Sequence, residues 1–212
     1  MSRYTEPDFS SSALITIDTQ RDTLDGQPLE IAGTSAILPK MQRLLELYRE
    51  RQKPVVHIVR IYKADSSNVD LCRKEAVEKG AKILLENEPG TELAKELFPG
   101  FEVRLDTELL LSGGIQRITP NEVIIYKPRW GAFYKTPLEN HLRELRVDTL
   151  LFTGCNYPNC PRASIYEASE RDFMIVMVED AVSGLYEKGK KEIQNIGVRA
   201  ATVDEVIQKI DV

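Results

Sequence analysis

Thr149-Leu-Leu-Phe-Thr-Gly-Cys-Asn-Tyr-Pro-Asn-Cys-Pro-Arg162 is an apolar run that ends in glycine and asparagine and leads into a proline. The apolar run predicts a buried strand, and Pro161 predicts the first turn of a helix. Cys160 is therefore expected at a strand-to-helix turn. The positive end of the helix dipole favours a thiolate over a thiol, so this position predicts a nucleophilic cysteine.

Short apolar runs alternate with segments of helical period along the rest of the chain, which is typical of repeated βαβ units. Six runs qualify as strands: Ala13–Ile17, Val55–Ile61, Glu122–Tyr126, Thr149–Thr153, Met174–Val178 and a weak one at Arg199–Val203. The first five are too apolar to leave one face exposed. The pattern predicts an α/β fold with three layers, α-β-α, in which helices cover both faces of an open, mostly parallel six-stranded sheet.

Helices are predicted where apolar residues recur three and four positions apart, at 36–51 and 203–210. Thr136-Pro-Leu-Glu139 has the spacing of a capping box with proline at the first helical position, and a stripe of Leu138, Leu142 and Leu145 follows it. Between residues 65 and 120 the pattern loosens into turns and short helical pieces. This stretch is predicted to be an excursion over the sheet edge.

Length and composition narrow the class of protein. A chain of 212 residues suits one α/β domain, predicted to span residues 1–212. A net charge of −5 does not indicate nucleic-acid binding. No apolar stretch has the character of a signal segment or the length of a membrane span. Three cysteines are too few for a disulfide framework. These features predict a cytoplasmic protein with reduced thiols that acts on a small molecule and binds neither nucleic acid nor membrane.

Asp18, Lys127 and Cys160 each lie just past the carboxyl end of a predicted buried strand. Ligands of open parallel sheets bind at that edge. Each residue alone has a plain alternative: the aspartate as a turn or cap residue, the lysine as a solvated strand end, and the cysteine as a small core residue. Their common placement favours one shared site.

The motifs around these residues resemble those of the isochorismatase-like cysteine hydrolases, which include nicotinamidases, N-carbamoylsarcosine amidases, ureidoacrylate amidohydrolases and biuret hydrolases. The resemblance runs from about residue 13 to residue 203 and rests on Leu14-Ile-Thr-Ile-Asp-Thr-Gln20, Tyr126-Lys-Pro-Arg-Trp-Gly-Ala-Phe133, Thr153-Gly-Cys-Asn-Tyr-Pro-Asn-Cys160, and Val178-Glu-Asp-Ala181 followed by Ser183. It implies that Asp18, Lys127 and Cys160 are the catalytic triad and that the chain forms a homo-oligomer.

Hydrolysis of an amide or ureide needs a nucleophile, a proton acceptor and donors for the developing oxyanion. Cys160 would attack the carbonyl and form a thioester. His57 lies within a predicted strand and His141 within a predicted helix, so neither supports a Cys-His pair, and Asp18 is left as the base. The chain is therefore predicted to be an amidohydrolase that cleaves a C–N bond and releases ammonia or an amine.

The oxyanion donors would be the backbone N–H of Cys160 and, by the resemblance, that of Asn156, which follows a cis peptide bond in family members. Two other functions stay open: a vinyl-ether hydrolase of the isochorismatase type, and a non-catalytic relative that serves as a binding or scaffold module. The intact triad favours C–N cleavage over both.

No metal and no other cofactor is predicted. Nicotinamidases of this family bind a metal through an Asp-x-His element downstream of the second strand, where this chain has Ile58-Val-Arg-Ile-Tyr-Lys-Ala-Asp65. His57, alone on an apolar strand, is interpreted as a hydrogen-bonded core histidine, because a metal site needs several converging ligands.

Four residues are candidates for substrate binding. Trp130 could form an apolar wall for a planar substrate or simply pack in the core. Arg129 and Arg162 could each hold a carboxylate with their planar guanidinium group, or lie on the surface. Tyr157 departs from the pattern of ureidoacrylate-type members and could shape a different pocket. Cys155 is close enough to the site in sequence to be partly reactive, but it is interpreted more simply as a turn residue.

Overall fold

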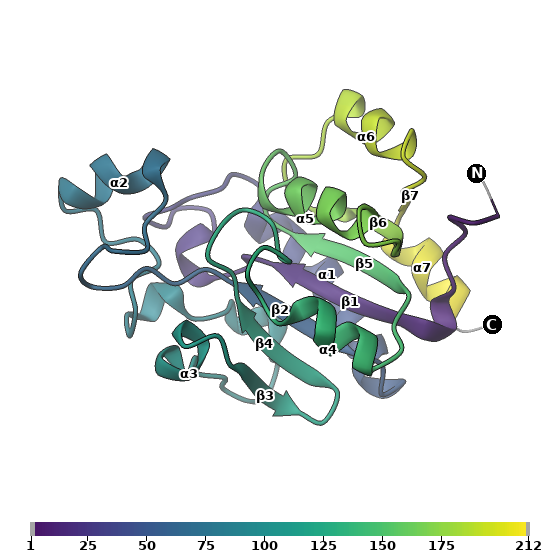
Figure 1. Cartoon of the computed structure of the whole chain (residues 1–212), viewed down its shortest axis with the longest axis horizontal. Helices are drawn as coiled ribbons and strands as arrows, with labels where there is room; N and C mark the ends of the chain where they lie inside the picture. The colour runs from purple at the N-terminus through teal and green to yellow at the C-terminus, as the bar shows by residue number, and fades with distance from the viewer. Residues whose placement is uncertain (1–2, 211–212) are drawn as a thin grey trace.

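The computed structural model describes residues 3–210 and contains a seven-stranded sheet in the order β3-β4-β2-β1-β5-β6-β7, with helices on both faces (Figure 1). The strands are β1 (Ser12–Ile17), β2 (Val55–Val59), β3 (Ile115–Thr119), β4 (Glu122–Tyr126), β5 (Thr149–Gly154), β6 (Met174–Val182) and β7 (Arg199–Ala201). The α-helices are α1 (Thr34–Glu50), α2 (Leu71–Glu78), α3 (Thr107–Leu111), α4 (Leu138–Glu144), α5 (Cys160–Ser169), α6 (Glu187–Gln194) and α7 (Val203–Ile210).

The sheet is covered on both sides because its central strands are apolar on both faces. Ile15 and Phe152 pack with side chains of α4, α5 and α6, whereas Leu14 and Leu151 pack with side chains of α1, α3 and α7. In Figure 1, α4 and α5 lie in front of the sheet and α1 lies behind it. The predicted α/β class with three layers is confirmed.

The sheet has seven strands, so the predicted number of six is wrong. The additional strand, β3, pairs antiparallel with β4 at the sheet edge, inside the stretch predicted to be an excursion. Its residues are half-buried or exposed. A short edge strand with one face toward solvent carries fewer apolar residues than a central parallel strand, and for that reason its pattern was not distinctive.

Helices α1 and α7 occupy the predicted stretches, but the predicted capping box does not form. Helix α4 begins at Leu138 with Pro137 as its N-cap residue and no side-chain cap. The Thr136 hydroxyl instead donates to the Ala132 carbonyl at 2.6 Å, and Glu139 pairs with Arg171 at 2.9 Å. Glu139 thus has a partner distant in sequence, whereas Thr136 bonds within the loop before the helix, where its hydroxyl also accepts from the Leu138 N–H at 3.4 Å. Leu145 lies beyond the end of the helix and is exposed, so it is not part of the apolar stripe.

Gly154 ends β5 where that strand lies against the end of β1. Its φ is +105°, and a Cβ atom there would come within 2.2 Å of the Ile17 carbonyl oxygen. Only glycine accepts both the backbone conformation and the contact. The close approach brings the loop that follows β5 alongside Asp18.

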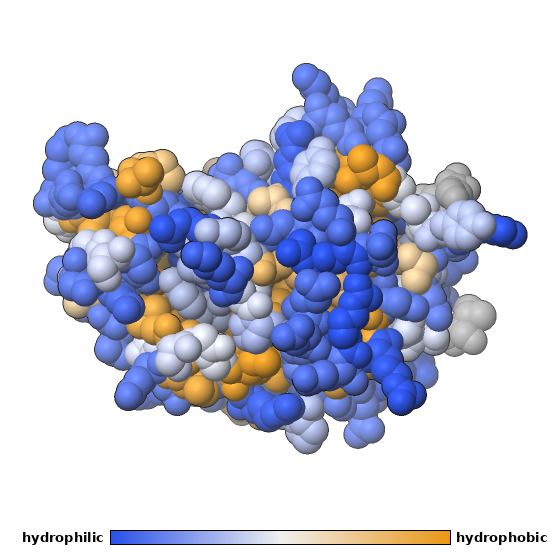
Figure 2. All heavy atoms as spheres, in the orientation of Figure 1, coloured by the Kyte–Doolittle hydropathy of each residue, from blue (hydrophilic) through white to orange (hydrophobic). Residues whose placement is uncertain are grey.

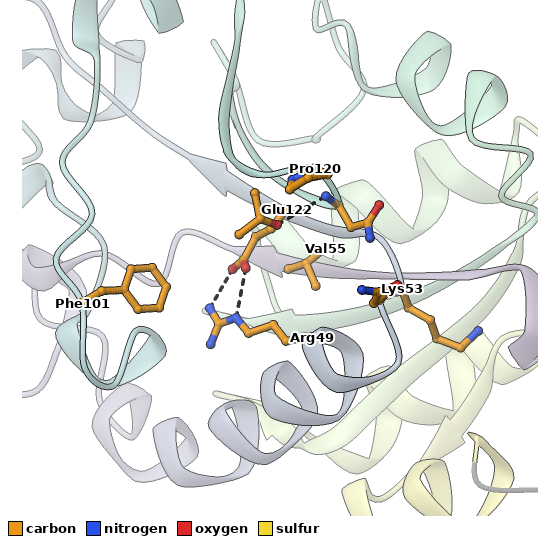
Figure 3. Close-up of a pocket in the computed structure, with 9 residues that line it drawn as sticks. Arg49, Lys53, Val55, Phe101, Pro120 and Glu122 are labelled. Carbon is orange, nitrogen blue, oxygen red and sulfur yellow. Dashed lines mark hydrogen bonds and ion pairs between the residues drawn. The ribbon is translucent and has the colours of Figure 1, made fainter.

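A cavity of about 470 Å³ lies at the amino ends of β2 and β4, at the other end of the parallel strands from Gly154 (Figure 3). Its main charged groups pair with each other: Arg49 donates to both carboxylate oxygens of Glu122, at 2.7 and 3.0 Å. His57, which is fully buried, lies 2.7 Å from Glu122 through Nε2 and 2.8 Å from the Thr16 hydroxyl through Nδ1. The interpretation of His57 as a hydrogen-bonded core histidine is confirmed.

This buried histidine makes stability depend on pH. Burial lowers the pKa of His57, and the bond to Glu122 offsets only part of that effect. Below about pH 6.5 the His57 imidazole is therefore protonated in the unfolded chain but not in the native chain. The free energy of unfolding should fall as the pH drops below that value. We expect a slope approaching about 1.4 kcal/mol per pH unit between pH 6.5 and 5. Urea denaturation of wild type and His57→Gln measures it, and identical slopes would contradict the expectation.

The face seen in Figure 2 is mostly hydrophilic, and its apolar side chains form separate patches. Exposed large apolar residues include Leu71 on α2 and Phe101 in the loop before α3. No helix among residues 3–210 has the length and apolar content that a membrane span requires.

Candidate active site

The carboxyl ends of four parallel strands meet at one edge of the sheet. The register pairs Ile17 of β1 with Ile58 of β2 and with Gly154 of β5, while β4 runs beside β2. Asp18 follows β1, Lys127 follows β4, and Cys160 is the first residue of α5 after the loop from β5. The three residues lie at the same edge, at the point where the strand order reverses around β1, as expected for an open parallel sheet.

Lys127 joins the other two side chains. Its Nζ atom lies 2.8 Å from Asp18 Oδ2 and 3.3 Å from Cys160 Sγ, and it also donates to the Arg129 carbonyl at 3.2 Å. The lysine side chain has to pass the end of β2, which lies between β4 and β1. All three residues are buried, at 1% exposure for Lys127 and 6% for Asp18 and Cys160. The ammonium is therefore held between a carboxylate and a sulfur atom, away from solvent.

The electrostatics of the site favour a thiol in the resting protein. Burial, followed by the Asp18 carboxylate, raises the pKa of Cys160, and Lys127 offsets only part of this. Desolvation of the sulfur thus opposes the thiolate that the position at the start of α5 favours. Burial alone would lower the pKa of Lys127, but the Asp18 carboxylate beside it raises the pKa overall, so Lys127 keeps its proton.

One of the two carboxylate oxygens of Asp18 is available as a hydrogen-bond acceptor. Oδ2 accepts from Lys127, whereas Oδ1 is buried and has no hydrogen-bond partner among residues 3–210. The backbone of Asp18 has a φ of +47°, a left-handed conformation in which aspartate is one of the better tolerated residues. An unpartnered carboxylate oxygen near a protonated thiol is an acceptor for the thiol proton.

The loop before Cys160 has the expected backbone form. The Cys155–Asn156 peptide bond is cis, which confirms that part of the prediction. The loop is held by the Tyr157 N–H, which donates to the Ser183 carbonyl at 2.8 Å. The N–H of Cys160 lies in the first turn of α5, where backbone donors have no acceptor within the helix. These N–H groups of Asn156 and Cys160 remain the candidates for an oxyanion hole.

Cys155 has the structural role that the sequence indicated. Its thiol donates to the Asp18 carbonyl at 3.0 Å, and burial raises its pKa to about 12. Cys155 therefore supports the backbone of Asp18.

A narrow cavity opens beside Cys160, lined by Asp18, Thr23, Leu29, Ile31, Arg73, Leu84, Trp130, Cys155, Asn156, Asn159 and Cys160. The volume open to the centre of a water-sized sphere is about 10 Å³, which is room for about one water molecule. Entry of a substrate therefore requires some part of this lining to move.

Of the four residues predicted to bind substrate, only Trp130 lines this cavity. The Tyr157 side chain is buried elsewhere, with its hydroxyl donating to the Gly189 carbonyl at 2.6 Å. Arg162 forms an ion pair with Glu192 at 2.7 Å, and Arg129 is about half exposed and bonds to backbone carbonyls. These three assignments are corrected, because the contacts of each side chain hold it outside the cavity.

Arg73 was missed by the sequence analysis, although it lines the cavity. It lies on α2, in the charged run Asp70-Leu-Cys-Arg-Lys-Glu75, which is typical of a solvated helix face. Nothing in the local pattern distinguishes Arg73 from its charged neighbours. Its position depends on how α2 returns toward the sheet.

The end of β2 does not fit a metal. Arg60, buried there, pairs with Asp70 and donates to the Lys127 carbonyl at 2.8 Å. A guanidinium group has no lone pair to give to a metal ion. Among residues 3–210 no cluster of three or more His, Cys, Asp or Glu side chains could hold one.

An α/β sheet with a thiol, a carboxylate and an ammonium group at its carboxyl edge defines the class of cysteine hydrolases to which the sequence motifs pointed. The chain belongs to the isochorismatase family, because the isochorismatase domain model matches residues 12–205. This confirms the family resemblance, and the chain is a hydrolase.

Relatives are similar along most of the chain. A probable inactive nicotinamidase of Arabidopsis thaliana is 26% identical over 203 residues, which is 93% of this chain and 95% of that protein. N-carbamoylsarcosine amidase of an Arthrobacter species is 27% identical over 198 residues, covering 89% of this chain and 67% of that protein. The crystal structure of an isochorismatase family protein from Desulfovibrio vulgaris superposes with a TM-score of 0.80 at 28% identity, covering 95% of this chain and 99% of the other.

Proposed function

We propose that the chain hydrolyses a C–N bond of a small amide, ureide or carbamoyl compound through a thioester on Cys160. The observation that carries the proposal is the contact of Lys127 with both Asp18 and Cys160, at 2.8 and 3.3 Å, in a buried site. The similarity to N-carbamoylsarcosine amidase supports the same substrate classes.

In the first half-reaction, Cys160 Sγ bonds to the carbonyl carbon while Asp18 takes the thiol proton. The carbonyl oxygen becomes an oxyanion, for which the backbone N–H groups of Asn156 and Cys160 are the proposed donors. The C–N bond then breaks, and Asp18 returns the proton to the leaving nitrogen. Ammonia or an amine departs, and the acyl group stays on sulfur as a thioester.

In the second half-reaction, water replaces the leaving amine. Asp18 takes a proton from the water as its oxygen bonds to the thioester carbon. The C–S bond then breaks, and the proton returns to the sulfur. Lys127 stays charged throughout and holds the Asp18 carboxylate and the Cys160 sulfur in position.

A non-catalytic role was the alternative that the sequence left open, and one relative is described as a probable inactive nicotinamidase. The complete set of Asp18, Lys127 and Cys160 in contact argues against it. A binding module would have no need for a proton acceptor and an ammonium group beside a buried thiol.

Asp18→Asn tests the proposal. We expect a loss of activity of about 10²- to 10⁴-fold, because asparagine cannot accept the thiol proton. The assay is release of ammonia or amine from a panel of small amides, ureides and carbamoyl compounds, with isochorismate included for vinyl-ether cleavage. Turnover of isochorismate alone, no turnover by wild type, or undiminished turnover by Asp18→Asn would each reject amide hydrolysis by this mechanism.

The remaining proposal concerns assembly. Homo-oligomer formation rests on the family resemblance, and light scattering of the whole chain measures it directly. A mass equal to that of one chain at working concentration would reject it.

A further inference from the structure

Arg73 is an unbalanced positive charge beside the candidate nucleophile. It lines the same cavity as Asp18 and Cys160. No carboxylate among residues 3–210 forms an ion pair with it; its hydrogen bond goes from Nη1 to the Tyr62 hydroxyl at 2.9 Å. The nearby Asp70 carboxylate is already paired with Arg60 and accepts from Tyr62.

A count of charges around the cavity gives a surplus of one cation. Asp18 is balanced by Lys127 at 2.8 Å, and Cys160 carries no charge while it is a thiol. The surplus is the guanidinium group of Arg73. A partly buried cation without a partner is stabilised by an anion that enters with the substrate.

The surroundings of Arg73 hold its guanidinium group in place. The Tyr62 hydroxyl accepts from it, and its central carbon lies 5.4 Å from the centroid of the Trp130 ring, within the range of a cation–π contact. The guanidinium group has further N–H donors beyond the one used by Tyr62, and its planar fork matches the two oxygens of a carboxylate. The aliphatic side chains of Leu29, Ile31 and Leu84 line the rest of the cavity.

We infer that Arg73 binds a carboxylate of the substrate, and that the substrate is a small amide or ureide that also carries a carboxylate group. The inference rests on the proposed function for the identity of the scissile group, but binding of the carboxylate does not depend on turnover. A single guanidinium group in a narrow cavity fits a monoanion on a short spacer.

Helix α2 is suited to carry such a residue. None of its side chains is buried, and besides the contacts of Arg73 it has Val77, which packs on a small cluster around Tyr62 and Leu84. Little apolar contact would be lost if α2 moved to admit a substrate. A substitution at Arg73 should for the same reason leave the fold intact, which circular dichroism can verify.

The test compares acids with their uncharged amides. The probes are succinamate against succinamide and N-carbamoylglycine against N-carbamoylglycinamide, and the measurement is protection of Cys160 from iodoacetamide, located by mass spectrometry. For wild type we expect the acid to protect at a concentration at least about 10-fold lower than its amide in at least one pair. Arg73→Gln should remove this preference, and Arg73→Lys should keep only part of it.

Lys74→Gln is the matched control, because it removes the same charge from the exposed side of the same helix and should leave the preference unchanged. Equal protection by acid and amide in both pairs, no protection by either acid, or a preference that survives Arg73→Gln would overturn the inference. So would a change in Arg73→Gln limited to the alkylation rate of the free protein, since Arg73 would then act on the sulfur rather than on the substrate.

Turnover separates this inference from the proposed function. If the acids protect Cys160 through Arg73 but no amide or ureide is hydrolysed, the hydrolase proposal fails and the carboxylate site stands. If an acid is hydrolysed, Arg73→Gln should raise its KM about 10- to 100-fold with little change in kcat. Turnover of a panel without any acid preference would sustain the hydrolase and remove the role of Arg73.

Discussion

Replacing Cys160 by alanine is expected to abolish hydrolysis, with a fall of at least about 10⁴-fold in kcat. The thioester cannot form without the sulfur, and loss of a nucleophile removes the covalent route as a whole. The fold should persist, because the substitution removes one buried atom and leaves the ion pair between Lys127 and Asp18 in place. Ammonia release from the substrate panel gives the comparison.

Cys72→Ala is the control for the cysteine experiment. Cys72 is exposed on α2 and lies outside the cavity, so its removal should leave hydrolysis unchanged. In the wild type, rapid acid quenching during turnover should trap an acyl group on Cys160, visible as added mass on the peptide that contains it. Activity of Cys160→Ala comparable with wild type would eliminate the covalent mechanism.

Lys127→Met should have the largest effect on stability, a loss of about 3–5 kcal/mol, and should also abolish activity. Methionine fills similar space but leaves the Asp18 carboxylate buried without its ammonium partner. The cost comes mainly from that unpaired charge and less from the lost attraction. Urea denaturation followed by circular dichroism measures it.

The double variant Lys127→Met with Asp18→Asn identifies the cause. It removes both charges, so we expect it to recover much of the stability that Lys127→Met loses while staying inactive. A double variant that is less stable than Lys127→Met by the full cost of each change would show that packing of the lysine stem, and not the unpaired carboxylate, determines the loss.

The positions of Asp18, Lys127 and Cys160 could be predicted because each follows a strongly apolar run. Parallel strands place their carboxyl ends at one edge, so residues more than 30 positions apart in sequence had to meet there. The family motifs also implied the cis bond before Asn156, which the structure contains. The state of the thiol could not be predicted, because desolvation depends on packing that the sequence does not display.

Local sequence patterns were less informative where distant partners decide the outcome. Thr136 and Glu139 have the spacing of a capping box, yet the Glu139 carboxylate pairs with Arg171, 32 residues further along the chain. Arg162, in the first turn of α5, pairs with Glu192 of α6 and so points away from the cavity. The edge strand β3 has too little apolar character to be distinguished from the loops around it.

The amino-acid sequence by itself determined the layered α/β class, the edge of the sheet where the chemistry lies, and the three residues that meet there. It could do so because a parallel strand that is buried on both faces is a continuous apolar run in the sequence. The tertiary structure alone decided that the Cys160 sulfur is desolvated, which raises its pKa, and that Arg73 reaches the cavity. Both depend on which groups exclude water from the site and which charges remain unpaired, and these are properties of contacts between distant segments.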